Sequence, residues 1–313
     1  MTLPEGASYG SILLWELMNV LEKLKANFFF HVLLSRPNIQ KAYAMVKPED
    51  SWYDTISKVH RSLEEIRQLP HQTVQITSRD GLRLNAVYYP NESGKQITVI
   101  CVHGYTSHAE REWAFPGLFY HSLGCDVLIP YQRAHGPSQG KYISFGALEH
   151  RDVMQWVAQI NRLHPDGKIL IHGLSMGGGI VLNLADKEME NVKYLIADAP
   201  TPGIEAALRG ITGSVFKKDA DQVFPHVMKR FQKEFHADAA EFDGLKNVAG
   251  GKYPLLLAAG SNEHLEDLFE SLKKNNPQET QILILPGCDH GNGMYKQTQL
   301  FQSTIRDFIF RYL

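Results

Sequence analysis

The sequence predicts an α/β fold: an eight-stranded, mostly parallel sheet flanked by helices, with an N-terminal helical arm and a helical lid insertion. Two observations support this prediction. Short apolar runs alternate with helix-length segments from residue 97 onward, and these runs are continuous rather than alternating with polar residues. Continuous apolar strands are typical of parallel strands that crossover helices cover on both faces. A chain of 313 residues is long enough to bury such a core.

The composition is that of an ordinary soluble globular protein, with 43% hydrophobic and 21% charged residues. The formal net charge is −2 and no lysine and arginine cluster occurs, so we exclude a nucleic-acid-binding surface. The spacing of Cys101, Cys125 and Cys288 matches neither a metal site nor a disulfide framework. We therefore expect a cytoplasmic protein without a metal site, in which Cys101 and Cys125 are buried packing groups.

An N-terminal helical arm is expected over residues 1–70, before a main domain at 71–313. Within the arm, Ile12–Ser35 places six apolar residues on one helical face: Leu14, Leu17, Met18, Leu21, Leu24 and Phe28. Four charged residues interrupt the run, so it does not predict a membrane span: Glu16, Glu22, Lys23 and Lys25. The basic region and cleavage site of a secretory signal are also missing. This helix is expected to pack on the body of the protein, and the alternatives are attachment to a membrane surface and a homodimer contact.

The remaining elements follow in order along the chain. After a helix near 54–69, the β-rich segments 73–77 and 82–89 are joined by Arg79-Asp80-Gly81, which predicts a hairpin. Six further strands are expected at 97–102, 127–130, 168–172, 192–197, 253–258 and 281–285. Helices are expected at 111–123, 147–163, 176–188, 263–275 and 296–312. The segment 201–252 is too long for a simple connection and has helical spacing, so it predicts the lid over the carboxyl edge of the sheet.

A glycine-rich turn stands at the carboxyl end of one strand, where open α/β sheets bind their ligands. Gly173-Leu174-Ser175-Met176-Gly177 lies between the strand 168–172 and the next helix. G-x-S-x-G in this context lifts a serine hydroxyl above the sheet, and the glycines leave room where side chains would collide. Ser175 is therefore the candidate nucleophile. The alternative is a turn that binds a phosphate or merely reverses the chain.

A serine hydroxyl needs a base to take its proton, and the chain has 14 histidines. His290 lies in the loop after the last strand, at the same sheet edge as Ser175, and is the candidate base. His172 ends the strand below the serine and is expected to be a packing residue. His103 and His135 lie in other strand-end loops and are expected to be structural or to line the pocket.

The third member of the site is expected to be a carboxylate that orients the histidine. Glu263 follows the strand 253–258 and gives the chain order nucleophile, acid, base that G-x-S-x-G folds have. A glutamate in the first turn of a helix is also favoured by the helix dipole without any catalytic role. Asp198, after the preceding strand, is the alternative acid, and Asp267 is a weaker candidate.

Two backbone amides are expected to bind the oxyanion that develops during the reaction. The Met176 amide directly follows the nucleophile at the start of a helix. The second donor is expected in the loop after the strand 97–102, where Gly104 permits a sharp turn and Tyr105 supplies the amide. The Tyr105 ring is also a candidate wall of the acyl pocket.

Three segments together resemble the α/β-hydrolase superfamily: His103-Gly104-Tyr105-Thr106-Ser107, Arg133-Ala134-His135-Gly136-Pro137-Ser138 and Gly173-Leu174-Ser175-Met176-Gly177. They are similar to segments of bacterial serine esterases and acyl hydrolases, and the resemblance covers residues 73–313. It implies a triad, an oxyanion hole and no cofactor. Two loops depart from the family pattern. Tyr131-Gln132-Arg133-Ala134-His135-Gly136 lacks the usual aspartate before the arginine, and Gly260-Ser261-Asn262-Glu263 has glutamate where the family has aspartate.

The sequence thus predicts a serine hydrolase that cleaves a small-molecule carboxylic ester through an acyl-enzyme. Serine at the elbow argues against dehalogenase and epoxide-hydrolase chemistry, for which the resemblance implies aspartate. Thioesterase, peptidase and acyltransferase activities use the same groups and stay open. A non-catalytic binding protein with this fold is the alternative from another class, and the altered acid loop motivates it. The lid at 201–252 is expected to decide which substrates fit.

Overall fold

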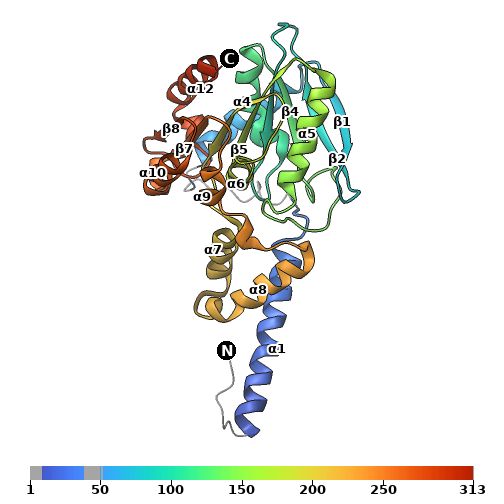
Figure 1. Ribbon diagram of the computed structural model, residues 1–313, viewed down its shortest axis with the longest axis vertical. Helices are drawn as coiled ribbons and strands as arrows, with labels where there is room; N and C mark the ends of the chain where they lie inside the picture. Colours follow the sequence, from blue (N-terminus) through green and yellow to red (C-terminus); the bar gives the residue numbers. More distant parts are fainter. Residues whose placement is uncertain (1–8, 39–49, 51, 313) are drawn as a thin grey trace.

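The structure is a computed structural model that describes residues 9–38, 50 and 52–312, with side chains from residue 20 onward. A central eight-stranded sheet has the strand order β1-β2-β4-β3-β5-β6-β7-β8 (Figure 1). In this sheet β2 runs antiparallel to its neighbours β1 and β4, and the remaining pairs are parallel. The strands are β1 (Gln72–Thr77), β2 (Arg83–Tyr89), β3 (Ile97–Val102), β4 (Asp126–Tyr131), β5 (Lys168–Leu174), β6 (Val192–Asp198), β7 (Leu255–Gly260) and β8 (Thr280–Leu285).

Helices cover both faces of the sheet. Successive side chains of a strand point to opposite faces, so strands that are apolar throughout need cover on both faces. In β3, Ile100 and Val102 belong to one apolar core, while Val99 and Cys101 belong to the other. The first core includes side chains of α5 (Glu149–Leu163), α6 (Met176–Asn183) and α10 (Glu266–Asn275). The second includes side chains of α3 (Ile56–Ile66), α4 (Ala109–Ser122) and α12 (Thr298–Tyr312). The fold class predicted from continuous apolar strands is thereby confirmed.

The predicted strands are all present, with boundaries that move by at most two residues. Helix α6 ends at Asn183 instead of 188, because the amides of Leu184 and Ala185 bond to carbonyls three residues back and tighten the last turn. The helix predicted over 263–275 is a 3₁₀ turn, η4 (Ser261–Glu263), followed by α10. The helix predicted over 296–312 likewise divides, into α11 (Gly293–Lys296) and α12.

The segment 201–252 is helical, as predicted. It contains α7 (Ile204–Phe216), α8 (Ala220–Phe235) and α9 (Gly244–Ala249), with the 3₁₀ turns η2 (Lys217–Asp219) and η3 (Ala239–Glu241). Helices α7 and α8 pack on each other, whereas α9 packs on α6 and α10. Figure 1 shows α7 and α8 away from the sheet, beside the blue N-terminal helix α1 (Tyr9–Val32).

Helix α1 packs against α8. The Phe30 ring lies 6.3 Å from the Phe235 ring, and Lys25 forms an ion pair with Asp219 at 2.8 Å. Helix α3, which follows the 3₁₀ turn η1 (Tyr53–Thr55), packs instead on α4. Helices α1 and α3 therefore contact different parts of the molecule.

The apolar face predicted for α1 is wrong wherever its side chains are described. Leu21, Leu24 and Phe28 are 49%, 59% and 52% exposed. The buried face contains Glu22, Ala26, Phe29 and Phe30. Apolar residues occur on both sides of this helix near its C-terminal end, and α8 covers the side that carries Phe29 and Phe30. The remaining members of the predicted face, Leu14, Leu17 and Met18, lie outside the described side chains.

Two further expectations concern the cysteines and the membrane. Cys101, Cys125 and Cys288 are buried free thiols, as expected of packing groups for the first two. Within residues 9–38 and 52–312, no helix is long and apolar enough to cross a membrane.

Candidate active site

Ser175 stands on a sharp turn between β5 and α6. Its backbone angles are φ 60° and ψ −116°, a strained conformation for a residue with a side chain. The glycines around it permit the close packing that holds this turn. A Cβ at Gly173 would lie 2.1 Å from the Gly177 carbonyl oxygen, and a Cβ at Gly177 would lie 2.0 Å from the Val102 oxygen. The serine is thus presented at the carboxyl edge of the sheet, as the G-x-S-x-G spacing predicts.

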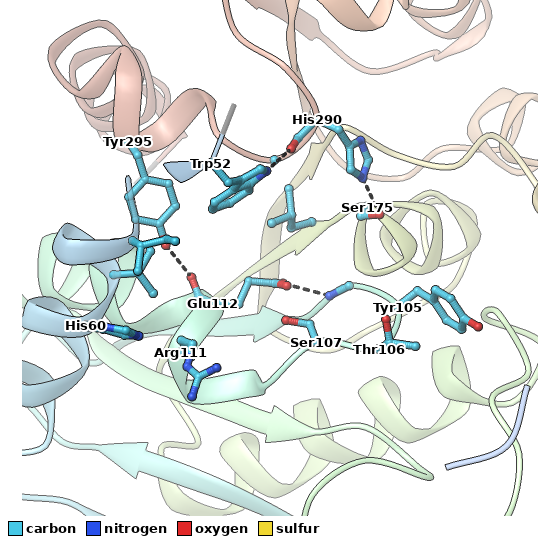
Figure 2. A pocket seen from close by; sticks show the side chains of 15 residues that line it. Trp52, His60, Tyr105, Thr106, Ser107, Arg111, Glu112, Ser175, His290 and Tyr295 are labelled. Carbon is cyan, nitrogen blue, oxygen red and sulfur yellow. Dashed lines mark hydrogen bonds between the residues drawn. The ribbon is translucent and has the colours of Figure 1, made fainter. Parts of the chain in front are cut away.

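Ser175, His290 and Glu263 form one hydrogen-bonded chain. His290 Nε2 lies 2.8 Å from Ser175 Oγ, and His290 Nδ1 lies 2.6 Å from Glu263 Oε2 (Figure 2 draws the first of these bonds). A carboxylate only accepts hydrogen bonds, so Nδ1 carries the proton and Nε2 accepts from the serine hydroxyl. The Glu263 carboxylate raises the pKa of His290, because it favours the charged imidazolium.

The glutamate in place of aspartate is accommodated by the turn that carries it. Glu263 ends the 3₁₀ turn η4 directly after β7, and its Oε1 accepts the Gly260 N–H at 2.9 Å. The second oxygen is thereby aimed at His290. The Gly260 backbone approaches the next loop so closely that a Cβ there would lie 2.3 Å from the Cys288 oxygen. The extra methylene is taken up by folding the side chain back onto its own turn.

Asp198, the alternative acid, ends β6 and is buried beside the same histidine. Burial, together with the neighbouring Glu263 charge, raises its pKa to about 8, so Asp198 is mostly protonated at neutral pH. Its carbonyl oxygen accepts the Ser175 N–H at 2.8 Å. Among the described residues, the hydrogen bond to His290 Nδ1 is made by Glu263. Asp267, the weaker candidate, is exposed in the first turn of α10.

The loop after β3 lies directly against Ser175. A Cβ at Gly104 would lie 3.3 Å from Ser175 Cβ, and the Gly104 N–H donates to Glu112 Oε1 at 2.8 Å. The two amides expected to bind the oxyanion belong to the two segments that meet at Ser175. The Tyr105 amide follows Gly104 in the loop after β3, and the Met176 amide is at the start of α6. The Tyr105 side chain agrees with its expected place at the cavity, but its hydroxyl group has a partner that the sequence did not predict. Its ring borders the cavity, but its hydroxyl donates to the Leu33 carbonyl just after α1.

A cavity of about 290 Å³ opens beside Ser175 and His290. Its apolar walls are Trp52, Ile56, Val59, Leu174 and Tyr295, and its polar groups include His60, Ser107, Arg111 and Glu112. Figure 2 shows Trp52 and Tyr295 above the cavity, with Glu112, Ser107 and Arg111 below it. Among the described residues none from 201–252 lines this cavity. The expectation that this segment decides substrate fit is therefore not supported for this cavity, whose wall comes instead from residues 52–60.

Trp52 lines the cavity beside Ser175 and His290, and no pattern in the sequence predicts it. Its Nε1 donates to the His290 carbonyl oxygen at 3.2 Å, and its ring packs edge-on against Tyr295. No motif marks this tryptophan. It precedes the body of the fold by about 20 residues and reaches the site only because α3 packs on α4.

The three histidines expected to have packing or structural roles, His103, His135 and His172, are buried. His172 is bonded to the Tyr120 hydroxyl at 2.7 Å, and burial lowers its pKa to about 3. His103 and His135 pack edge to face at 4.6 Å, and burial lowers the pKa of His135 to about 4. All three stay neutral at physiological pH. Within the described part of the chain, no group of three His, Cys, Asp or Glu residues is arranged to hold a metal.

The loop without the family aspartate is held by other carboxylates. Arg133 forms ion pairs with Asp80 at 2.9 Å and with Asp152 at 2.7 Å. Asp80 belongs to the turn between β1 and β2, and Asp152 belongs to α5. Two partners distant in sequence thus bind this buried guanidinium.

Comparisons with known proteins agree with this architecture. A family described as the α/β hydrolase fold matches residues 97–280. An uncharacterized protein of Bacillus subtilis, YqkD, is 31% identical over 258 residues, covering 80% of this chain and 83% of YqkD. An uncharacterized membrane protein of Saccharomyces cerevisiae, YNL320W, is 22% identical, with 80% and 83% of the two chains covered. The structure of the Pyrococcus furiosus esterase Pf2001 is similar with a TM-score of 0.61 and 25% identity, covering 80% of this chain and 93% of that one. On the match to the family and to YqkD, this chain belongs to the α/β-hydrolase family.

Proposed function

We propose that this protein is a serine hydrolase that cleaves carboxylic esters through an acyl-enzyme. The single observation that carries the proposal is the hydrogen-bonded chain from Ser175 Oγ through His290 to Glu263, at 2.8 Å and 2.6 Å. A strained serine paired with an oriented histidine is the arrangement that activates a hydroxyl for acyl transfer. The esterase activity named for the Pyrococcus furiosus relative supports an ester as the substrate.

In the proposed reaction, Ser175 Oγ attacks the ester carbonyl while its proton passes to His290 Nε2. Glu263 stabilises the imidazolium that forms. The amides of Tyr105 and Met176 donate to the oxyanion of the tetrahedral intermediate. His290 then protonates the leaving alcohol as the intermediate collapses to an acyl-enzyme. A water molecule, deprotonated by His290, attacks the acyl carbon and releases the acid and the free serine.

The cavity indicates the kind of ester. A volume of about 290 Å³ lies at the lower end of the range for ligand pockets, so one side of the substrate is small. The walls made by Trp52, Ile56, Val59, Leu174 and Tyr295 favour an apolar group. We therefore propose short-chain acyl esters of small alcohols as the first substrates to assay.

Active-site labelling tests the proposal directly. The wild type and Ser175→Ala are incubated with a fluorophosphonate probe and assayed on p-nitrophenyl acetate and butyrate. Covalent labelling at Ser175 and turnover in the wild type alone are expected. A wild type that neither labels nor hydrolyses any ester would leave a non-catalytic binding protein as the better hypothesis. Parallel assays on thioesters, peptides and acyl acceptors distinguish the thioesterase, peptidase and acyltransferase alternatives.

We also propose that α1 attaches the protein to an anionic lipid surface. Its exposed side carries five apolar residues: Val20, Leu21, Leu24, Phe28 and Val32. Exposed lysines occur on the same helix and near it: Lys23 on α1, and Lys217 and Lys218 on the turn that the Lys25–Asp219 ion pair joins to α1. An exposed apolar helix face with lysines in its neighbourhood suits the interface of an anionic membrane. The description of the yeast relative as a membrane protein supports this proposal.

Vesicle flotation tests the attachment. The wild type is expected to float with vesicles of phosphatidylcholine and phosphatidylglycerol, and Leu24→Glu/Phe28→Glu is expected to stay with the soluble fraction. Asn27→Glu, which adds one negative charge on the same exposed side, controls for charge alone. Equal flotation of the wild type and the double variant would contradict the proposal. A concentration-dependent dimer that the double variant abolishes would assign the face to a second copy of the chain.

A further inference from the structure

Glu112 is an ionisable side chain of the cavity that the proposed reaction does not use. It lies in the first turn of α4, and its Oε1 accepts a hydrogen bond from the Gly104 N–H at 2.8 Å. Its Oε2 lies 3.4 Å from the position that a Cβ at Gly104 would occupy, and Ser175 Cβ lies 3.3 Å from that same position. The Glu112 carboxyl group and Ser175 therefore both lie next to Gly104, in the loop between β3 and α4.

This hydrogen bond closes the loop that leads to the proposed oxyanion donor. The Glu112 amide donates to the His108 carbonyl at 3.0 Å, which anchors the residue in α4, while its side chain reaches back to Gly104. A buried backbone N–H needs an acceptor, and Glu112 supplies one. Because Tyr105 is the next residue, the direction of its amide depends on how Gly104 is held.

The charge of Glu112 matters because of where the oxyanion would form. In Figure 2 Glu112 and Tyr105 both lie below Ser175, whereas His290 lies above it. A carboxylate at this position repels an oxyanion bound by the neighbouring amides. A neutral carboxyl group holds the Gly104 N–H equally well and does not oppose that charge.

We propose that Glu112 is a positioning residue for the oxyanion loop and that its protonated form supports catalysis, whereas its ionised form slows it. This inference rests on the proposed ester hydrolysis at Ser175.

The surroundings of Glu112 place its titration in the working range of the enzyme. Burial raises the pKa of Glu112 to about 7, against the opposing effects of the Ser107 hydroxyl, the Gly104 N–H and a charged His290. The ionisable groups that interact with it electrostatically are His290 in the loop after β8, Asp198 at the end of β6 and Cys101 of β3. His60 of α3, Arg111 of its own helix and Tyr295 of α11 line the same cavity, and the Tyr295 hydroxyl donates to the Glu112 carbonyl oxygen at 3.4 Å.

Two groups then shape the pH profile in opposite directions. The rate rises as His290 loses its proton, because the base must be neutral. It falls as Glu112 loses its proton, because the new charge opposes the oxyanion. A bell-shaped profile of kcat/KM results, and its two limbs belong to the coupled pair. If the Glu112 charge instead assisted catalysis by stabilising the imidazolium, the descending limb would be missing.

The experiment compares kcat/KM on p-nitrophenyl butyrate from pH 5.5 to 9 for the wild type, Glu112→Gln and Glu110→Gln. Glutamine keeps the acceptor for Gly104 but cannot ionise, so Glu112→Gln is expected to lose the descending limb and to exceed the wild type roughly tenfold or more at pH 9. Glu110 is the matched control on the same helix. It is paired with Arg67, which lowers its pKa despite burial, so its substitution is expected to leave the shape of the profile unchanged.

A second variant tests the positioning role. Glu112→Ala removes the acceptor and is expected to lower kcat at pH 7 by about tenfold to a hundredfold with little change in KM, while Glu112→Gln retains kcat. The inference is overturned if Glu112→Gln keeps the descending limb, or if Glu112→Ala matches Glu112→Gln at pH 7. An inactive, unlabelled wild type would instead refute the proposed function, and with it this inference. Circular dichroism on each variant separates loss of fold from loss of positioning.

Discussion

The indole nitrogen of Trp52 donates a hydrogen bond to the carbonyl oxygen of His290 at 3.2 Å. This bond joins a residue before α3 to the loop that carries the proposed base, across 238 positions of sequence. The same indole forms part of the cavity wall. The N-terminal region thereby contributes both to the position of the histidine loop and to the shape of the cavity.

Trp52 is expected to control the size of the acyl group. Trp52→Ala enlarges the cavity, so we expect the preference among p-nitrophenyl acetate, butyrate and octanoate to shift toward the longer chain by about tenfold. Trp52→Phe keeps an aromatic wall but loses the hydrogen bond, and a smaller loss of kcat is expected. Glu205→Gln in the 201–252 segment is the control. If this control changed the chain-length preference more than Trp52→Ala does, the segment 201–252 and not Trp52 would determine substrate selection.

The proposed acid is tested by a pair of amide substitutions. Glu263→Gln replaces the carboxylate that contacts His290 Nδ1 and is expected to lower kcat by roughly 10² to 10⁴. Asp198→Asn replaces a carboxyl group whose pKa is already raised to about 8, so a loss below about tenfold is expected. Steady-state kinetics at pH 7 measure both. The reverse ranking would move the acid role to Asp198.

The pH dependence of the ascending limb follows from the Glu263–His290 contact. Glu263 raises the pKa of His290, so a more alkaline pH is needed to obtain the neutral base. Removing that charge with Glu263→Gln is expected to move the ascending limb of kcat/KM to lower pH while lowering its height. A limb that stays in place in this variant would mean that another group sets it.

The glycines of the elbow are expected to be required for folding. A Cβ at Gly177 would lie 2.0 Å from the Val102 carbonyl oxygen, a backbone atom that cannot move aside, so Gly177→Ala is expected to destabilise the protein by about 3 kcal/mol or more. Gly210→Ala in α7 is the matched control, since nothing lies within 4 Å of its Cβ position. This control is expected to gain about 0.5–1 kcal/mol from better helix propensity. Urea denaturation compares the two variants.

The strand positions and the elbow were predictable because near neighbours encode them. Continuous apolar runs specify buried strands wherever they lie, and G-x-S-x-G specifies a turn through its own backbone requirements. The order of the strand-end loops also pointed to Ser175, Glu263 and His290, which form one hydrogen-bonded chain with His290 in the middle. Their catalytic roles stay predictions that the kinetics above test.

The sequence did not predict which segments that are distant along the chain contact each other. Periodicity identified apolar residues on α1 but not the side that α8 covers, so the predicted face was the exposed one. The partners of Arg133 come from a turn and a helix on opposite sides of it in the sequence.

The sequence by itself determined the sheet, the elbow and the edge at which the candidate site lies, since each depends on local pattern and on chain direction. Only the tertiary structure decided that residues 52–60 line the cavity and that Glu112 holds the Gly104 amide. The cavity wall depends on how α3 packs on α4, and the Glu112 contact depends on how the loop after β3 folds back onto α4. Such packing is fixed by the fit of whole surfaces, which no single stretch of sequence contains.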